Sequence, residues 1–480
     1  MAPRVVAALA LLLAAAILSF QLLMPPFIGL ASNGDFPKVT GRLSLGPVGD
    51  WDSFQYFTAD YVRDPRYRWD SDVLSSELIP ASIALMASEA AGRAPRFDIR
   101  WLGALQAGMW LCAFGVLLAA LAPAAPGLRL AVTAVWLLIF TDASYVSYLN
   151  SFYSDVPAFL GALLIVASGV YLCARERPSW PGFFLFTGSA LFFITSKAQH
   201  AMWGIVPAVL QVWLRTRRGS IPLRASAVAA AFLLCCASAF VLLRTPARYS
   251  HEALFNILFY DELPHSRTPV EDLTDLGLDA SYAKWIGMNA YVKNSPTRDV
   301  QWMAEFIHRT SYGRLARLYW KHPGYALTKL RSDLINEAPL IRPFGVSNFQ
   351  RRDGHPPGAQ TTQFSSWSSA RSQLIRVWPY HLVCWYAFAF ACAVWIALSQ
   401  SGIRKRLAWL ALGIIVVAVG EFVVASLSEA IETYRHLFLF HTLTDVTLVG
   451  AVAAGVDALT RMRSRTRDTR SVLETADVTG

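Results

Sequence analysis

Ten apolar segments run along the chain, and polar connections separate them. They lie at residues 5–23, 101–121, 128–141, 156–173, 182–195, 202–214, 222–243, 380–398, 407–427 and 437–459. Because a helix rises about 1.5 Å per residue, a straight span of a bilayer needs at least about 17 residues. The segments that begin at Leu128, Gly182 and Met202 are shorter, so we expect them to extend into their flanks or to belong to broken helices. The pattern predicts an all-α polytopic membrane protein with about ten transmembrane helices.

The first segment follows a single basic residue, Arg4, as a signal peptide does. It is long enough to span, however, and it runs into Met24-Pro25-Pro26-Phe27 with no small-x-small cleavage site before the polar loop. We therefore expect an uncleaved first transmembrane helix.

Two large polar loops interrupt the series, at residues 31–100 and 245–378. In the first loop, Ser75, Ser76 and Glu77 interrupt a borderline apolar stretch at 73–86, which predicts an amphipathic interfacial helix. The second loop is long enough for a small folded subdomain. The chain thus divides into an N-terminal transmembrane module (1–244), the large second loop (245–378), C-terminal transmembrane helices (379–460) and a basic, partly disordered tail (461–480).

A helix is predicted over residues 300–334 of the second loop. His322-Pro323-Gly324 divides it, because proline disfavours the helical conformation of the residue before it. Its aromatic and basic positions fit two interpretations: a helix pair that packs on its own loop, or a face that rests on anionic lipid headgroups.

Only 16% of the residues are charged and 54% are hydrophobic, which agrees with an integral membrane protein. The net charge of +10 lies mainly in short loops, where it orients helices rather than binding nucleic acid. Alternate connections carry the basic residues Arg129, Arg175, Arg177, Arg215, Arg217, Arg218, Arg224, Arg404, Lys405, Arg406 and the tail arginines from Arg461 to Arg470. The opposite short connections carry only Lys197 and Arg435. This asymmetry predicts that both termini are cytoplasmic and that both large loops face outward.

Several function classes find no support in the sequence. There is no P-loop, G-x-G-x-x-G, G-x-S-x-G or H-E-x-x-H motif, and the predicted cytoplasmic loops are too short to build a nucleotide site. All six cysteines lie in the predicted spans, so neither a disulfide framework nor a zinc site is indicated.

Two acidic residues lie at predicted outward ends of spans. Asp35 follows the first span within Asn33-Gly34-Asp35-Phe36-Pro37-Lys38. Asp155 opens the fourth span, where Pro157 suits the first helical turn. Asp155 either caps this helix or faces a cavity, since ionisable groups at membrane depth are costly without a partner or a function.

Basic and polar residues gather on the same side. Ser196-Lys197-Ala198-Gln199-His200 offers ammonium, amide and imidazole donors that suit phosphate oxygens, although snorkelling alone explains Lys197. Glu432 has helical spacing to Arg435 and His436, which predicts either a surface ion pair or a site for a phosphate leaving group. Farther along this helix, we expect Asp445 to face the interior of the bundle.

These motifs and the overall architecture resemble the GT-C superfamily of membrane glycosyltransferases. The likeness covers nearly the whole chain. It is carried more narrowly by Asn33-Gly34-Asp35-Phe36, Asn150-Ser151-Phe152-Tyr153-Ser154-Asp155, Ser196-Lys197-Ala198-Gln199 and Arg435-His436-Leu437-Phe438-Leu439-Phe440, which are similar to segments of bacterial hexose transferases of surface-glycan biosynthesis.

The resemblance implies a role for each matched residue. Asp35 would be the general base that deprotonates an acceptor hydroxyl, and Asp155 would assist or position the acceptor. Lys197 and Arg435, together with His200 and His436, would hold the lipid-linked phosphate. Supporting or acceptor contacts are expected from Asn33, Tyr153, Gln199 and Glu432. The first-loop motif lacks the adjacent second acidic residue common in the superfamily. This departure leaves open whether the site binds a divalent cation, and it makes Asp50 and Asp52 alternative candidates for the general base.

We therefore expect an inverting glycosyltransferase in the bacterial cytoplasmic membrane, with its active site facing outward. It would transfer a sugar, expected to be a hexose, from a polyprenyl-phosphate donor to an extracytoplasmic glycan or lipid acceptor. Two alternatives stay open. An O-antigen ligase or polymerase would depend on Arg314, Arg317 and His322 in the second loop, and a flippase or transporter would show half-repeats, which the sequence lacks.

Overall fold

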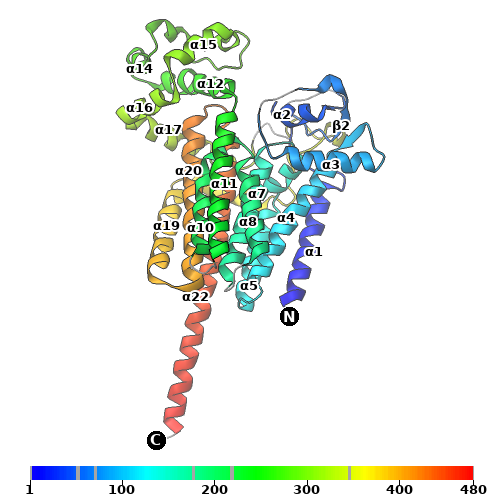
Figure 1. The fold of residues 1–480 in the computed structure, drawn as a ribbon, viewed down its shortest axis with the longest axis vertical. Helices are drawn as coiled ribbons and strands as arrows, with labels where there is room; N and C mark the ends of the chain where they lie inside the picture. The colour runs from blue at the N-terminus through cyan, green and yellow to red at the C-terminus, as the bar shows by residue number, and fades with distance from the viewer. Residues whose placement is uncertain are drawn as a thin grey trace.

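The computed structural model describes residues 3–49, 54–69, 73–175, 179–216, 221–343 and 348–478. The rival bases Asp50 and Asp52, and the loop residues Arg177, Arg217 and Arg218, lie outside this described part. The protein is a long helical bundle with both large loops at one end, which we call the loop end (Figure 1). Both chain termini lie toward the opposite end (Figure 1).

Helices occupy all ten predicted positions, which confirms the all-α polytopic fold. The long helices of the bundle are α1 (Pro3–Leu22), α4 (Arg100–Leu121), α5 (Pro126–Phe140), α7 (Asp155–Ala174), α8 (Trp180–Ile194), α10 (Ile205–Thr216), α11 (Ile221–Arg244), α19 (His381–Ser399), α20 (Gly402–Ser428) and α22 (Phe438–Val478). Short helical turns connect some of them: α6 (Ala143–Val146), η3 (Ser147–Asn150), α9 (Ala198–Ala201), η4 (Met202–Gly204) and α21 (Thr433–His436).

Seven helices of the described chain are long and apolar enough to cross a membrane, and one bent pair makes an eighth candidate. In this pair, α5 and the segment Ala143–Asn150 meet at 58°. The break falls at Asp142, whose backbone is extended and whose carboxylate accepts a hydrogen bond from the Ser144 N–H at 2.9 Å, restarting the helix. The segment expected to be short at Gly182 remains a 15-residue helix, α8.

Helix α7 is the central element of the bundle. Its apolar window is 78% buried, against 22–50% for the other six spans. Gly161 lets α7 approach α8 closely, since a Cβ atom at this position would lie 2.9 Å from Cβ of Phe193 and 3.1 Å from its backbone. This contact draws together the loop end of α7, which begins at Asp155, and that of α8, which leads to Lys197.

The first large loop contains a small sheet that the sequence did not predict. Its elements are α2 (Pro37–Thr40), η1 (Gly41–Leu43), β1 (Leu45–Pro47), β2 (Asp60–Arg63), η2 (Pro65–Tyr67), α3 (Leu78–Ala90) and β3 (Arg96–Asp98). The strands form an antiparallel sheet in the order β1-β2-β3, with Tyr61 paired to Phe97. Strands of three or four residues are too short to show the alternation that identifies a strand in a sequence.

Helix α3 (Leu78–Ala90) overlaps the stretch at 73–86 that was predicted to form an interfacial helix, but it starts later, at Leu78. It crosses the loop end of α1 and α4 (Figure 1). Ala81, Ala84 and Leu85 are buried, whereas Ile79, Ile83 and Met86 are exposed. An exposed apolar face at the level of the helix ends is the arrangement expected of a helix that rests in a membrane surface.

The second large loop folds into a helical subdomain. Its elements are α12 (Ala247–Phe255), the π-helical η5 (Asn256–Glu262), α13 (Leu263–His265), α14 (Pro269–Asp275), η6 (Ala280–Trp285), η7 (Pro296–Arg298), α15 (Val300–Arg309), α16 (Tyr312–Lys321) and α17 (Pro323–Asn336), followed by η8 (Arg351–Asp353) and α18 (Ser366–Val377). Phe255, Phe259, Phe306, Leu315 and Leu318 form its buried core.

The predicted helix over 300–334 is therefore three helices. The break at His322 is as predicted. A second break was missed at Thr310, whose backbone is extended, because Ser311 caps α16 by accepting from the Arg314 N–H at 3.3 Å. Phe306, Leu315 and Leu318 pack into the subdomain core, as the helix-packing interpretation expects, while Trp320 is 89% exposed.

The tail at 461–480, which was expected to be partly disordered, is helical as far as Val478 in the described part of the chain. Helix α22 continues from Phe438 to Val478 as one helix of 41 residues. No glycine or proline occurs between Gly455 and Gly480 to end it. The pair between Arg461 and Asp457, at 2.6 Å, also has the i,i+4 spacing that supports a helix.

Candidate functional site

The site is built around Asp35, which lies just before α2 at the loop end. Its carboxylate accepts from Nη1 of Arg435 in α21, 400 positions away in the chain. Its other oxygen accepts from Nζ of Lys38, three residues later. Gly34 has a φ of +101°, a conformation that favours glycine, and this turn brings Asn33 and Asp35 back toward the bundle. The Asp35 side chain remains 28% exposed, so water or a ligand can reach it.

Three more predicted residues hold Arg435 in place. The Tyr153 hydroxyl donates to Oδ1 of Asn33 at 3.1 Å, and Nδ2 of Asn33 donates to Oε2 of Glu432 at 2.8 Å. The same Glu432 oxygen lies 3.3 Å from Nε of Arg435, and the guanidinium lies 5.5 Å from the centre of the Tyr153 ring. Glu432 has a left-handed backbone with φ of +58°, a strained conformation for a residue with a side chain.

The second half of the site contains Asp155, Lys197 and His436. Nζ of Lys197 lies 3.6 Å from Oδ1 of Asp155 and 3.0 Å from Nδ1 of His436. Because an ammonium group only donates, Nδ1 accepts, and the ring proton of His436 sits on Nε2. That nitrogen lies 3.7 Å from Oε1 of Glu429. Since Arg435 and His436 are neighbours in the chain, the two halves form one cluster of cations and carboxylates.

The charges in this cluster are strongly perturbed. Burial raises the pKa of Asp35, but Arg435 and Lys38 outweigh it and hold that pKa well below its usual range. Burial, with Lys197 and Arg435 nearby, lowers the pKa of His436, so its ring is neutral. Burial raises the pKa of Glu429 to about 7, although Lys197 and Arg435 oppose this shift. The site thus combines a firmly ionised carboxylate with one that titrates near neutrality.

The comparisons with known proteins agree with this membrane architecture. The sequence profile of the family described as YfdI N-terminal transmembrane domain matches residues 2–474. The chain belongs to this YfdI family. No curated protein and no solved structure matches the chain. The YfdI family is a GT-C-like membrane glycosyltransferase family, so the match agrees with the resemblance at the level of the whole family.

In this member of the YfdI family, Gln199 and His200 lie behind the cluster. Nε2 of Gln199 donates to Oε2 of Glu421 at 2.5 Å and approaches the His436 carbonyl at 3.4 Å. His200 is buried, with Nδ1 2.9 Å from the Ser196 hydroxyl, and burial lowers its pKa to about 3. A buried neutral imidazole does not suit the phosphate-binding role expected of His200. Its contacts instead support the turn that carries Lys197.

Three residues of the site were not assigned a role from the sequence: Lys38, Glu429 and Glu421. Lys38 has the i,i+3 spacing to Asp35 that a helical turn brings into contact. Glu421 is an acidic residue inside an apolar span, which is itself a signal of a buried partner. Its oxygens accept from Gln199 and, at 2.7 Å, from Nε1 of Trp203.

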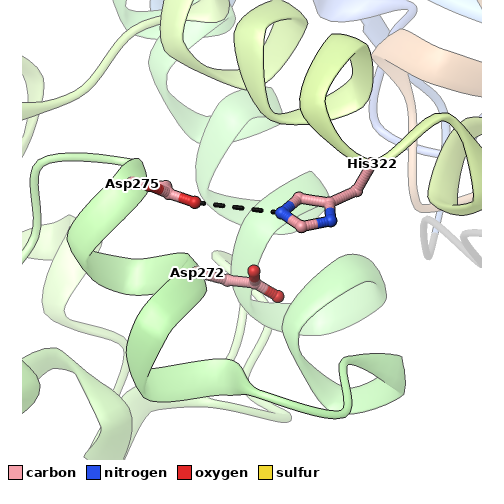
Figure 2. A group of neighbouring side chains, drawn as sticks. All are labelled: Asp272, Asp275 and His322. Carbon is pink, nitrogen blue, oxygen red and sulfur yellow. Dashed lines mark ion pairs between the residues drawn. The ribbon is translucent and has the colours of Figure 1, made fainter.

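A group of side chains of the kinds that bind metal ions lies elsewhere, in the second-loop subdomain. Asp272, Asp275 and His322 point toward one another from α14 and the start of α17 (Figure 2). Their ligand atoms lie within 4.8 Å of one another, and this is the one such group among the described residues. Nζ of Lys321 donates to Asp275 at 2.6 Å and already supplies a positive charge there. The group ties α14 to α17, and none of its contacts involves Asp35.

Proposed function

We propose that the chain is an inverting glycosyltransferase that moves a hexose from a polyprenyl-phosphate donor to a glycan or lipid acceptor on the outer face of the membrane. The observation that carries this proposal is the shared site of Asp35 and Arg435. A carboxylate that can take a proton and cations that can hold a phosphate meet at the loop end of a membrane bundle. Membership of a GT-C-like family adds support.

The chemistry follows from these groups. The acceptor oxygen attacks the anomeric carbon and loses its proton to a carboxylate, while the bond from that carbon to the phosphate oxygen breaks. The bonding electrons leave with the phosphate, whose charge Arg435 and Lys197 stabilise, so no acid is required for the leaving group. Attack from the face opposite the phosphate inverts the anomeric configuration.

Asp35 is a weak base in the resting site, because two cations neutralise it. A donor phosphate competes with Asp35 for Arg435. When Arg435 turns toward the phosphate, the carboxylate loses a cation, its pKa rises, and it becomes a better proton acceptor. Donor binding would therefore activate the base, which keeps the acceptor from being deprotonated in an empty site.

The ligase alternative would place the function in the second loop. There, Arg314 lies against Gly277, where an added Cβ would be 2.4 Å from its Nη1, and His322 lies 3.9 Å from Asp275. These contacts join parts of the subdomain to one another, so the observations favour the cluster at Asp35.

The test is transfer of radiolabelled hexose from polyprenyl-phosphate donors by purified protein, with wild type beside Asp35→Asn. Transfer by wild type and a loss of at least about 100-fold in Asp35→Asn are expected, in the range seen for a general base. Asp64→Asn is the matched control, because Asp64 lies in the same loop and contacts Arg66 rather than the cluster. Equal rates for Asp35→Asn and wild type would remove Asp35 from the reaction.

A further inference from the structure

A cavity lined by arginines lies in the first loop, and none of its lining residues belongs to the candidate site. It has a volume of about 800 Å³ and opens between the small sheet, the end of α3 and the start of α4. Four arginines line it: Arg93, Arg96, Arg100 and Arg352. Tyr61 and Phe97 line the cavity and pack on the buried ring of Phe152, which in turn packs on Phe36 beside Asp35, with the centroids of Tyr61 and Phe152 5.2 Å apart. The cavity is therefore a separate space.

Its charges are only partly neutralised. Arg100 is bound to Asp98 at 2.5 Å, and Arg352 is bound to Asp60 at 3.0 Å. Arg93 and Arg96 are exposed, and neither has an acidic partner among the described contacts. Among its described lining residues, the cavity thus carries an excess of two positive charges from guanidinium groups, which suit phosphate oxygens in geometry as well as charge.

The local backbone holds these two arginines at the rim. Helix α3 ends in a turn in which the Gly92 N–H donates to the Glu89 carbonyl at 2.9 Å and the Arg93 N–H donates to the Ser88 carbonyl at 3.1 Å. Gly92 has a φ of +73°, as this type of helix end requires. The Arg96 N–H then donates to the Arg93 carbonyl at 2.9 Å, just where β3 begins. Both arginines are therefore fixed to ordered elements.

A strip of small exposed residues leads from the cavity down α4. The strip begins at Ala104, which lines the cavity together with Trp101, and Gly108 and Cys112 follow Ala104 at intervals of about one helical turn. An added Cβ at Gly108 would meet no atom within 4 Å. Helix α4 is one of the candidate membrane spans, so this strip faces the hydrocarbon layer directly below the arginines. A soluble anion would need only the cavity, whereas a lipid would also use the strip.

We infer that this cavity binds the phosphate-bearing headgroup of a membrane lipid, whose chain runs along the small-residue strip of α4. The volume lies in the range of ligand sites and exceeds what a bare phosphate needs. Two sources share this chemistry: an anionic phospholipid of the bilayer, and a polyprenyl-phosphate lipid that takes part in the reaction. The inference does not depend on the proposed transfer reaction, because the site is defined by binding.

The test measures lipid binding to the full-length protein in detergent by native mass spectrometry. Phosphatidylglycerol, a polyprenyl monophosphate, zwitterionic phosphatidylcholine and inorganic phosphate are titrated separately. Because each arginine near a membrane surface contributes about fivefold, R93Q/R96Q should weaken binding of the two anionic lipids about 25-fold. The matched control R298Q/R331Q removes two exposed arginines of the second loop and should change binding less than about twofold.

Two further variants separate the possibilities. Gly108→Leu fills the strip and should weaken lipid binding while leaving the fold intact. Titrations repeated in K197Q/R435Q remove the cations of the candidate donor site, so that binding which survives belongs to the cavity. Equal affinity for both anionic lipids would identify the natural ligand as a phospholipid of the bilayer. Tighter binding of the polyprenyl monophosphate would identify it as a lipid that takes part in the reaction. Unchanged binding in R93Q/R96Q, or inorganic phosphate binding as tightly as the lipids, would overturn the inference, whatever the transfer assay shows.

Discussion

Nζ of Lys197 lies 3.0 Å from Nδ1 of His436, and this contact joins two loops that are 239 positions apart in the chain. It links the start of α9 to α21, which also carries Arg435. Lys197 thereby belongs to the same cluster as Asp35, although the two residues share no direct contact in the described structure. The proposed donor site depends on this link, because it joins Lys197 to the turn that carries Arg435.

Replacing Lys197 by glutamine should weaken donor binding. A charge-assisted hydrogen bond contributes about 1.5–3 kcal/mol, so KM for the polyprenyl-phosphate sugar should rise about 10- to 150-fold. The measurement is steady-state transfer at varied donor concentration. Lys293→Gln removes an exposed lysine of the second loop and serves as the control. A KM equal to that of wild type would exclude Lys197 from the donor site.

Arg435→Lys should keep the charge and lose most of the activity. Arginine contacts Asp35 and Glu432 at once, which a lysine ammonium group cannot reproduce with the same geometry. A loss of about 100-fold in kcat/KM is expected, as for other groups that stabilise developing charge. Because the two residues act together, combining the change with Asp35→Asn should cost little more than the worse single variant. Fully additive losses would mean that Asp35 and Arg435 act independently.

The raised pKa of Glu429 makes a prediction about pH. An acid whose pKa is about 7 in the folded protein and near 4.5 in the unfolded chain stabilises the fold fully below pH 4.5, and this stabilisation is lost as the pH rises to 7. Glu429→Gln removes this dependence. After allowance for the partial exposure of Glu429, the wild type should lose about 2 kcal/mol relative to the variant between pH 5 and pH 8. The test is to measure the melting temperatures of wild type and Glu429→Gln from pH 5 to pH 8. Melting temperatures that change with pH in the same way in both proteins would contradict the prediction.

Gly161→Ala should disturb the site from a distance. The new methyl group would meet the Phe193 backbone at 3.1 Å, so α7 and α8 must move apart. This separates Asp155 from Lys197, and transfer should fall about 10-fold or more because reacting groups tolerate little displacement. Gly188→Ala on α8 is the matched control, since an added Cβ there meets nothing within 4 Å and alanine favours a helix. A similar activity for both variants would show that the close α7–α8 contact does not position the site.

Asp445→Asn should destabilise the protein without touching the cluster. Asp445 is 2% exposed on its side chain and pairs with Arg371 at 3.1 Å, while also accepting from Tyr145 at 2.6 Å. Removing its charge leaves Arg371 buried without an ionic partner, at a cost of about 3–5 kcal/mol. Thermal unfolding of wild type and Asp445→Asn in detergent measures this loss of stability. Asp457→Asn, farther along α22 where Asp457 pairs with the half-exposed Arg461, should cost less than about 1 kcal/mol.

The long helices could be read from the sequence because burial in a membrane requires an uninterrupted apolar run. The gathering of Asp35, Asp155, Lys197 and Arg435 at one end followed from the same runs, since each residue lies at a span end on the same side. What could not be read was the pairing within the cluster. Which carboxylate meets which cation depends on backbone turns such as Gly34 and Glu432, and on the Gly161 contact, none of which leaves a periodic pattern.

Other differences have local causes. The three-stranded sheet went unpredicted because its strands are very short, and the helix end at Thr310 was missed because a single serine cap marks it. The position of His200 does not favour its expected role for another reason: its ring is buried, whereas Lys197, three residues earlier, reaches Asp155 and His436. Neighbouring positions in a loop do not share an environment.

Because α21 follows the ninth of the ten predicted spans, Arg435 and His436 are among the last site residues to emerge from the ribosome. Synthesis proceeds from the N-terminus, and Asp35, Asp155 and Lys197 are in place long before them. A nascent chain that has inserted only its first helices holds Asp35, Lys38, Asp155 and Lys197 and lacks the arginine that pairs with Asp35. Such a chain would lack part of the proposed phosphate contacts, so transfer by the proposed reaction would begin only after the last helical hairpin, α20 and α22, has entered the bilayer. The order of the chain thus makes the final insertion event the step that completes the cluster.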